Sequence, residues 1–145
     1  MSNNWGSTDK LARTQSLDKF RDNGHNPRKD YMANEIIGRF YFRRTSNGNL
    51  IGEFSNNKSG VGGLPQTSTE SCDLIGSDTG DYLGEYYSTW QEKGEPQFAN
   101  LKISPKNGTN RLFSLEWKKS GTRIFKGEGM LCDNVLIGDY QNGNY

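Results

Sequence analysis

Long apolar runs are missing from this chain. No stretch of its 145 residues approaches the roughly 20 consecutive apolar residues of a membrane-spanning helix. Its start, MSNNWGSTDK, lacks the apolar segment of a signal peptide. Cysteine is scarce as well, since only Cys72 and Cys132 occur, and the strands expected to carry them are not neighbours. We therefore expect a cytoplasmic protein with no membrane partner and with two free, buried thiols.

Histidine is nearly absent, and neither sign of charge is in clear excess. The single histidine, His25, has no second histidine and no cysteine nearby, which excludes a catalytic dyad or zinc site built on histidine. Basic and acidic residues nearly balance, 18 against 17, so the cationic field of a nucleic-acid-binding domain is missing. The glycine-rich SGVGG at 59–63 is followed by Leu64 and Pro65, not by the lysine of a phosphate-binding loop. We expect no cofactor, no metal and no nucleic acid.

Aromatic residues and glycine, in contrast, are plentiful. Aromatics make up 12% of the chain and glycine occurs 18 times, a composition typical of short strands joined by tight turns. Residues 1–33 are polar and predict an N-terminal arm, mobile or with a short helix. Residues 34–145 alternate with a period of two and predict one all-β domain. Its expected strands are about 35–45, 49–56, 70–78, 81–92, 97–104, 110–118, 122–131 and 134–141.

A five-residue pattern recurs four times in the β domain. It reads IIGRF at 36–40, LIGEF at 50–54, YLGEY at 82–86 and LIGDY at 136–140. Residues two apart share one face of a strand, and an unpartnered buried charge is too costly to repeat four times. We therefore expect the glycine and the aromatic ring to face the core and the charge to face water. The inward glycines would be Gly38, Gly52, Gly84 and Gly138, and the outward charges Arg39, Glu53, Glu85 and Asp139.

The first expected hairpin allows a register to be predicted. If Phe42 lies opposite Phe54, the loop has three residues, 47–49, with Gly48 at the left-handed position. The same register sets Arg43 opposite Glu53 on the outer face, which is a favourable pair.

Eight short strands with short connections can close on themselves or split into two sheets. Closure removes exposed edges, so we expect an antiparallel up-and-down barrel, with a β-sandwich as the alternative. The strands LIGEF, YLGEY and LIGDY, and the segment FSLEWKKSGTRIFKGEGML at 113–131, resemble the calycin group, the avidins more than the lipocalins. The likeness is one of strand pattern over about 110 residues. It implies the barrel and carries over no ligand.

Chain direction gathers aromatic residues at one end of the expected barrel. Alternate strands run the same way, so their last inward residues meet at one rim. Those residues are Phe54, Trp90, Trp117 and Tyr140, with Tyr86 and Phe40 one layer deeper. The opposite end would collect the aliphatic residues Leu50, Ile103, Leu112 and Leu131. The rings either fill the barrel as core or line a binding mouth that the loop at 55–69 could cover.

Three functions are compatible with this pattern. The first is a non-enzymatic barrel that binds a small, partly apolar or aromatic ligand at the rim through the six aromatic residues. The second is a protein-interaction module, of inhibitor or immunity type, that uses loops and the N-terminal arm on a solid barrel. A barrel isomerase or cyclase comes third because no inward-facing acid–base pair is evident. An open cavity would favour the first, and a filled barrel with an exposed apolar patch the second.

Overall fold

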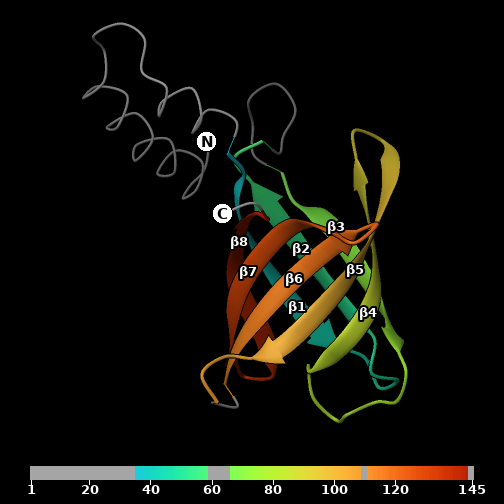
Figure 1. Ribbon diagram of the computed structural model, residues 1–145, viewed down its shortest axis with the longest axis vertical. Coiled ribbons are helices and arrows are strands. Elements are labelled where there is room, and N and C mark those ends of the chain that lie inside the picture. The colour runs from blue at the N-terminus through green and yellow to red at the C-terminus, as the bar shows by residue number, and fades with distance from the viewer. Residues whose placement is uncertain (1–34, 59–65, 109–110, 144–145) are drawn as a thin grey trace, which may run out of the picture.

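Eight β-strands close into one antiparallel barrel in the computed structural model, which describes residues 35–58, 66–108 and 111–143. Each strand pairs with the next along the chain, and β8 pairs with β1 (Figure 1). The strands are β1 (Ile37–Arg44), β2 (Leu50–Asn56), β3 (Ser68–Ile75), β4 (Gly84–Glu92), β5 (Glu95–Pro105), β6 (Leu112–Lys119), β7 (Thr122–Cys132) and β8 (Val135–Asn142). The predicted all-β up-and-down barrel is confirmed. The predicted arm at 1–33 lies outside the described residues.

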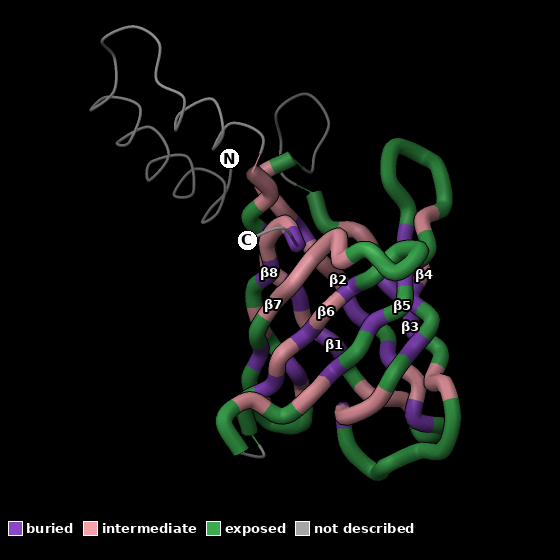
Figure 2. Tube along the Cα trace, viewed as in Figure 1, coloured by how far each residue is buried: buried purple, intermediate pink, exposed green. Residues whose placement is uncertain are grey.

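Burial alternates along the strands, as Figure 2 shows by its change of colour from residue to residue. Gly38 and Gly52 of the recurring pattern are buried, whereas Glu85 and Asp139 are exposed, as the pattern predicts. The core inside the barrel is made of aromatic and aliphatic side chains. Its fully buried members include Phe42, Leu50, Tyr86, Leu101, Leu115 and Leu136.

Two different close approaches require glycine in the recurring pattern. A Cβ atom added to Gly38 would lie 2.3 Å from Cε1 of the Tyr140 ring on the neighbouring strand. A Cβ atom added to Gly52 would lie 1.8 Å from the carbonyl oxygen of Tyr41, which is backbone and cannot rotate away. Glycine thus makes room for a ring in β1 and for the neighbouring main chain in β2.

The predicted register of the first hairpin is wrong by two residues. Phe42 lies opposite Gly52, and Arg43 lies opposite Ile51 instead of Glu53. Glu53 instead faces Tyr41, whose hydroxyl donates a hydrogen bond of 2.5 Å to its carboxylate. A shift of two residues leaves every side chain on its original face, so the alternation could fix the facing but not the register.

The loop of this hairpin explains the shift. Five residues, 45–49, connect β1 to β2 where three were predicted, because the strand pairing ends at Arg44 and Leu50. The Thr45 amide donates to the Asn49 carbonyl at 2.8 Å, and the Asn49 amide donates to Oγ1 of Thr45 at 3.1 Å. Gly48 has a φ of 85° and takes the left-handed position, as predicted.

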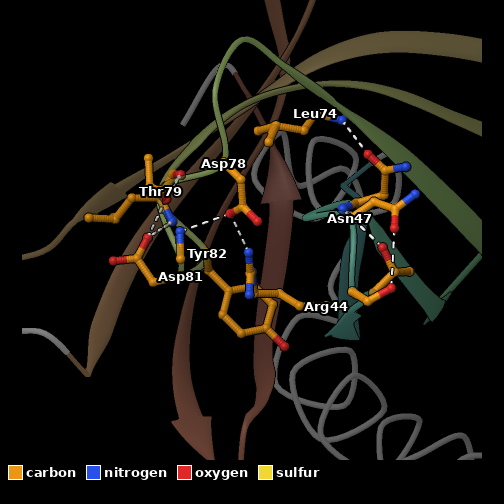
Figure 3. Close-up of polar contacts among 12 residues, drawn as sticks. Arg44, Asn47, Leu74, Asp78, Thr79, Asp81 and Tyr82 are labelled. Atoms are coloured by element: carbon orange, nitrogen blue, oxygen red, sulfur yellow. Dashed lines mark hydrogen bonds and ion pairs between the residues drawn. The ribbon is translucent and has the colours of Figure 1, made fainter.

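The loop between β3 and β4 folds across one end of the barrel (Figures 1 and 3). Tyr82 in this loop is buried, and its hydroxyl lies 2.9 Å from the carbonyl of Phe42 and 2.7 Å from that of Asn134. Figure 3 shows the Arg44–Asp78 ion pair beside Tyr82. Tyr82 therefore ties together the main chains of two hairpins and closes this end.

Leu112 does not help to close this end, contrary to the prediction. It is 38% exposed and pairs with Met130 on the outer face of the barrel. Leu112 and Trp117 are five residues apart, so they lie on opposite faces of β6, and the one irregularity of the strand follows Trp117. Leu131, in contrast, packs against the core as predicted.

The two cysteines are unpaired, on β3 and β7. Cys72 is fully buried, whereas Cys132 is exposed at the end of its strand. The prediction of two buried thiols is therefore wrong for Cys132, which follows the inward Leu131 and so turns outward.

Candidate functional site

A cavity of about 690 Å³ opens at the end of the barrel opposite Tyr82. Strands β2, β4, β6 and β8 end here and β1, β3, β5 and β7 begin here, so the side chains at this end come from every part of the described chain. The cavity reaches inward to Phe40 and Glu70 and outward to the tip of the β4–β5 hairpin, which projects beyond the rim (Figure 1).

Six aromatic rings form a connected cluster in the cavity wall, and Phe40 joins it through Trp117, with ring centroids 5.9 Å apart. Phe125 lies at its centre, with its ring centroid 5.4 Å from Tyr140, 6.3 Å from Trp90 and 6.5 Å from Trp117. Phe54 completes the ring of contacts, 6.5 Å from Trp90 and 6.3 Å from Tyr140. All of these pairs are edge-to-face, an arrangement in which the rings hold one another in place.

The structure brings five of the six predicted site residues together in the cavity wall. They are Phe40, Phe54, Trp90, Trp117 and Tyr140. The sixth, Tyr86, lies deeper, and its hydroxyl donates a hydrogen bond of 2.8 Å to the carbonyl of Tyr82 at the closed end. The geometry of the rim is as the sequence predicts. That these residues bind a ligand stays a prediction.

Phe125 is a wall residue that the sequence reasoning missed. Counting back from the β6–β7 turn, where Lys119 pairs with Thr122, would set Ile124 opposite Trp117. A bulge between Trp117 and Lys118 shifts the pairing by one residue and puts Phe125 there instead. The alternation of β7 through the inward residues Gly129 and Leu131 was the signal that could have found it.

Glu70 is the second missed residue and the more consequential one. It lies in β3 opposite Trp90, is only 4% exposed, and forms part of the cavity wall. It was overlooked because charged residues were assigned to the outer face. The signal was the alternation of STESCDLI, in which Glu70 shares a face with Cys72 and Leu74.

Three hydrogen bonds converge on one oxygen of the Glu70 carboxyl. Its Oε2 accepts from Oγ of Ser88 at 2.5 Å, from Nε1 of Trp117 at 2.8 Å and from Sγ of Cys72 at 3.9 Å. Burial raises the pKa of Glu70, and the three donors, which favour the carboxylate, only partly offset this. Glu70 is therefore a buried acid that is held through one oxygen and has a pKa above that of an ordinary carboxyl.

Tyr140 adds its hydroxyl to the polar groups of the cavity wall, which also include Asn56 and Ser68. Its hydroxyl accepts a hydrogen bond of 2.8 Å from Nδ2 of Asn56. Burial raises the pKa of Tyr140 well above its usual range, so the phenol is neutral at physiological pH.

The outer rim of the cavity is charged. Lys58, Glu92 and Lys93 lie there and are exposed, and Nε1 of Trp90 donates to the Glu92 carboxylate at 3.2 Å. These groups are screened by water, so they act weakly on the interior compared with Glu70.

The described part of the chain carries neither a metal centre nor a membrane helix. Across residues 35–58, 66–108 and 111–143, no group of three or more His, Cys, Asp or Glu side chains is placed to hold a metal ion. Within those ranges there is also no helix with the length and apolar character that crossing a membrane requires.

The fold and the cavity together define a closed eight-stranded antiparallel barrel with an aromatic pocket at one end. No family model, no curated protein and no solved structure matches this chain. The function is therefore inferred from the geometry of the pocket alone.

Proposed function

We propose that this protein is a non-enzymatic barrel that binds a small, partly apolar ligand in the aromatic cavity. The observation that carries the proposal is the open cavity of about 690 Å³, at one end of a barrel whose other end is closed. Pockets for small molecules typically measure about 300–1,000 Å³ and are lined by apolar and aromatic groups with a few polar ones. Six rings, one of them the phenol of Tyr140, and the carboxyl of Glu70 fit that description.

The rings would supply most of the affinity. Aromatic side chains offer large contact areas with few rotatable bonds, so little conformational entropy is lost when a ligand binds between them. The ring contacts already fix Phe54, Trp90 and Phe125 relative to one another. A pocket organised in this way is suited to a planar or branched apolar group.

Two finer points belong to the same proposal. The barrel would be of the calycin kind, an interpretation supported by its eight strands joined in sequence order. The protein would act in the cytosol, which the unpaired Cys72 and Cys132 support because free thiols persist in a reducing compartment.

A protein-interaction module is the second candidate, and one surface feature favours it. Leu112, Met130 and Ile137 pair across β6, β7 and β8 on the outer face and are 38%, 56% and 45% exposed. A row of this kind can dock a partner. If it does, Met130→Lys should abolish partner capture while ligand binding in the cavity is unchanged.

A barrel isomerase or cyclase stays the third candidate. Its low rank came from the lack of an inward acid–base pair, and Glu70 now supplies one inward acid. The groups bonded to it, Ser88, Trp117 and Cys72, all act as donors and do not supply a complementary base.

A filled cavity would test the first candidate. Ser68 lines the cavity beside Phe54, whereas Ser71 lies exposed on the outer face of the same strand. The neutral apolar dye Nile red should bind wild-type protein and the Ser71→Phe control, with a rise in dye fluorescence. Ser68→Phe should lose this binding while keeping the wild-type circular dichroism spectrum. Equal dye binding by all three proteins would contradict the proposal.

A further inference from the structure

Glu70 has one carboxyl oxygen that its neighbours do not use. All three hydrogen bonds to Glu70 within the described part of the chain go to Oε2, and Trp117 and Ser88 hold that oxygen in place. The residue lines the cavity, so the other oxygen, Oε1, is the one left for an occupant. Within the described residues, Oε1 is not one of the buried side-chain atoms that lack a partner, so it is open to water or to an occupant of the cavity.

The surroundings of Glu70 favour one kind of occupant. Phe54, Trp90, Phe125 and Tyr140 line the same cavity, together with Trp117, which bonds directly to Glu70. The face of an aromatic ring carries partial negative charge and attracts cations, and several rings around one point form the cage that binds quaternary ammonium groups. A cage and a carboxyl in one cavity select for positive charge on a group of apolar bulk.

The hydrogen bonds to Oε2 of Glu70 also favour a cationic occupant. Each of the donors Ser88, Trp117 and Cys72 lowers the pKa of Glu70 and so favours the carboxylate. Burial is the opposing effect, and it is the larger in the empty cavity. A cation in the cavity would oppose the effect of burial and favour the ionised form of Glu70.

We infer that the ligand carries one ammonium or quaternary ammonium group, held inside the aromatic cage by the carboxylate of Glu70. This inference rests on the proposed function, because it requires the cavity to be the binding site. It narrows the substrate class from apolar molecules in general to organic cations with an apolar body.

An isosteric pair of probes tests the inference on wild-type protein. Benzyltrimethylammonium and neopentylbenzene have the same shape and differ in charge. Displacement of Nile red should show the cation binding about tenfold more tightly or better, as expected for a desolvated cation facing rings and a carboxylate. Equal affinities, or tighter binding of the neutral probe, would overturn the inference.

Two variants locate the effect. Glu70→Gln should reduce the preference for the cation while Nile red and neopentylbenzene still bind, whereas Glu85→Gln, on the exposed outer face, should keep it. A preference of unchanged size in Glu70→Gln would overturn the inference and leave the proposed function standing. Failure of Nile red to bind wild-type protein would instead overturn the proposed function.

The pH profile in wild-type protein gives a readout that needs no variant. Benzyltrimethylammonium has no ionisable proton. Cys72 and Tyr140 interact electrostatically with Glu70, and burial raises the pKa of each further above the range in which a carboxyl titrates. Lys58, Glu92 and Lys93 are the charged groups of the rim. Affinity for the cation should rise with pH through the raised pKa of Glu70. A fall in affinity with rising pH would mean that protonated Glu70 is the form that binds, which contradicts the inference.

Discussion

The contact between Gly38 and Tyr140 gives the sharpest test of the inner wall of the barrel. In Gly38→Ala, the new Cβ atom would lie 2.3 Å from Cε1, 2.4 Å from Cζ and 2.7 Å from the hydroxyl oxygen of Tyr140. Carbon atoms pack at about 3.5–4.0 Å, so the ring must move by more than about 1 Å. The space behind it is already taken by Trp117 and Phe125, whose centroids lie 5.9 Å and 5.4 Å away.

The cost follows from what that movement breaks. Overpacking of a core position destabilises by about 1–3 kcal/mol. Loss of the hydrogen bond from Asn56 to the Tyr140 hydroxyl adds about 0.5–1.5 kcal/mol. The lower entropy of alanine in the unfolded chain returns about 0.4–1 kcal/mol. We expect Gly38→Ala to lower the free energy of unfolding by about 1–3 kcal/mol.

Urea denaturation of a double-mutant cycle measures this interaction. In a Tyr140→Leu background the Cβ atom that Gly38→Ala adds no longer meets a ring, so the cost of that substitution should shrink by at least about 1 kcal/mol. Near-ultraviolet circular dichroism should show the altered ring packing in the single variant only. The same cost in both backgrounds would refute the reasoning, because the clash would then not be with Tyr140.

Three further predictions follow from the same geometry. Gly84→Val should lower the free energy of unfolding in urea by about 1–3 kcal/mol, since Gly84 faces inward with a φ of 145°, whereas Glu85→Gln should change it little. Equal changes in the two variants would contradict the assignment of Gly84 to the inner face and Glu85 to the outer face. Wild-type protein should lose stability as pH rises from the ordinary pKa of a carboxyl through the raised pKa of Glu70, because in this range the folded state binds a proton that the unfolded state has released. Thermal melts of Glu70→Gln should show a smaller change with pH. Parallel curves for the two proteins would contradict this. Trp90→Phe should weaken Nile red binding and leave the hydrogen bonds of Glu70 intact, whereas Trp117→Phe would remove one of its donors. Undiminished dye binding by Trp90→Phe would place the site elsewhere.

Much of the fold could be predicted because alternation decides which face of a strand is buried. The inward Phe40, Phe54 and Tyr140 and the antiparallel order of the strands follow from that one rule. The register of β1 and β2 could not, since pairing Phe42 with Gly52 or with Phe54 satisfies the same alternation. What decided between them was the local bonding of Thr45 to Asn49, which no periodicity reports.

The candidate site was predicted in outline and missed in its chemistry. Chain direction alone gathers Trp90 and Trp117 at one rim, and the structure places both in the cavity wall. Phe125 was missed because a bulge changes the count from the turn. Glu70 escapes prediction because a charge usually marks the outer face of a strand, although the alternation of its own strand places it inside. Whether the rings fill the barrel or leave it open depends on the angles at which they pack, and these angles cannot be predicted from the sequence pattern.

The central claim is that the aromatic cavity binds a small molecule, and its most direct test is to identify the small molecules that co-purify with the protein. Wild-type protein, Ser68→Phe and Ser71→Phe would be purified in parallel, denatured, and their released small molecules measured by mass spectrometry. We expect one or a few compounds enriched with wild-type protein and with the outer-face control Ser71→Phe, and lost from the cavity variant Ser68→Phe. Identical profiles for the two variants, with each folded by circular dichroism, would contradict the claim that the aromatic cavity is the binding site.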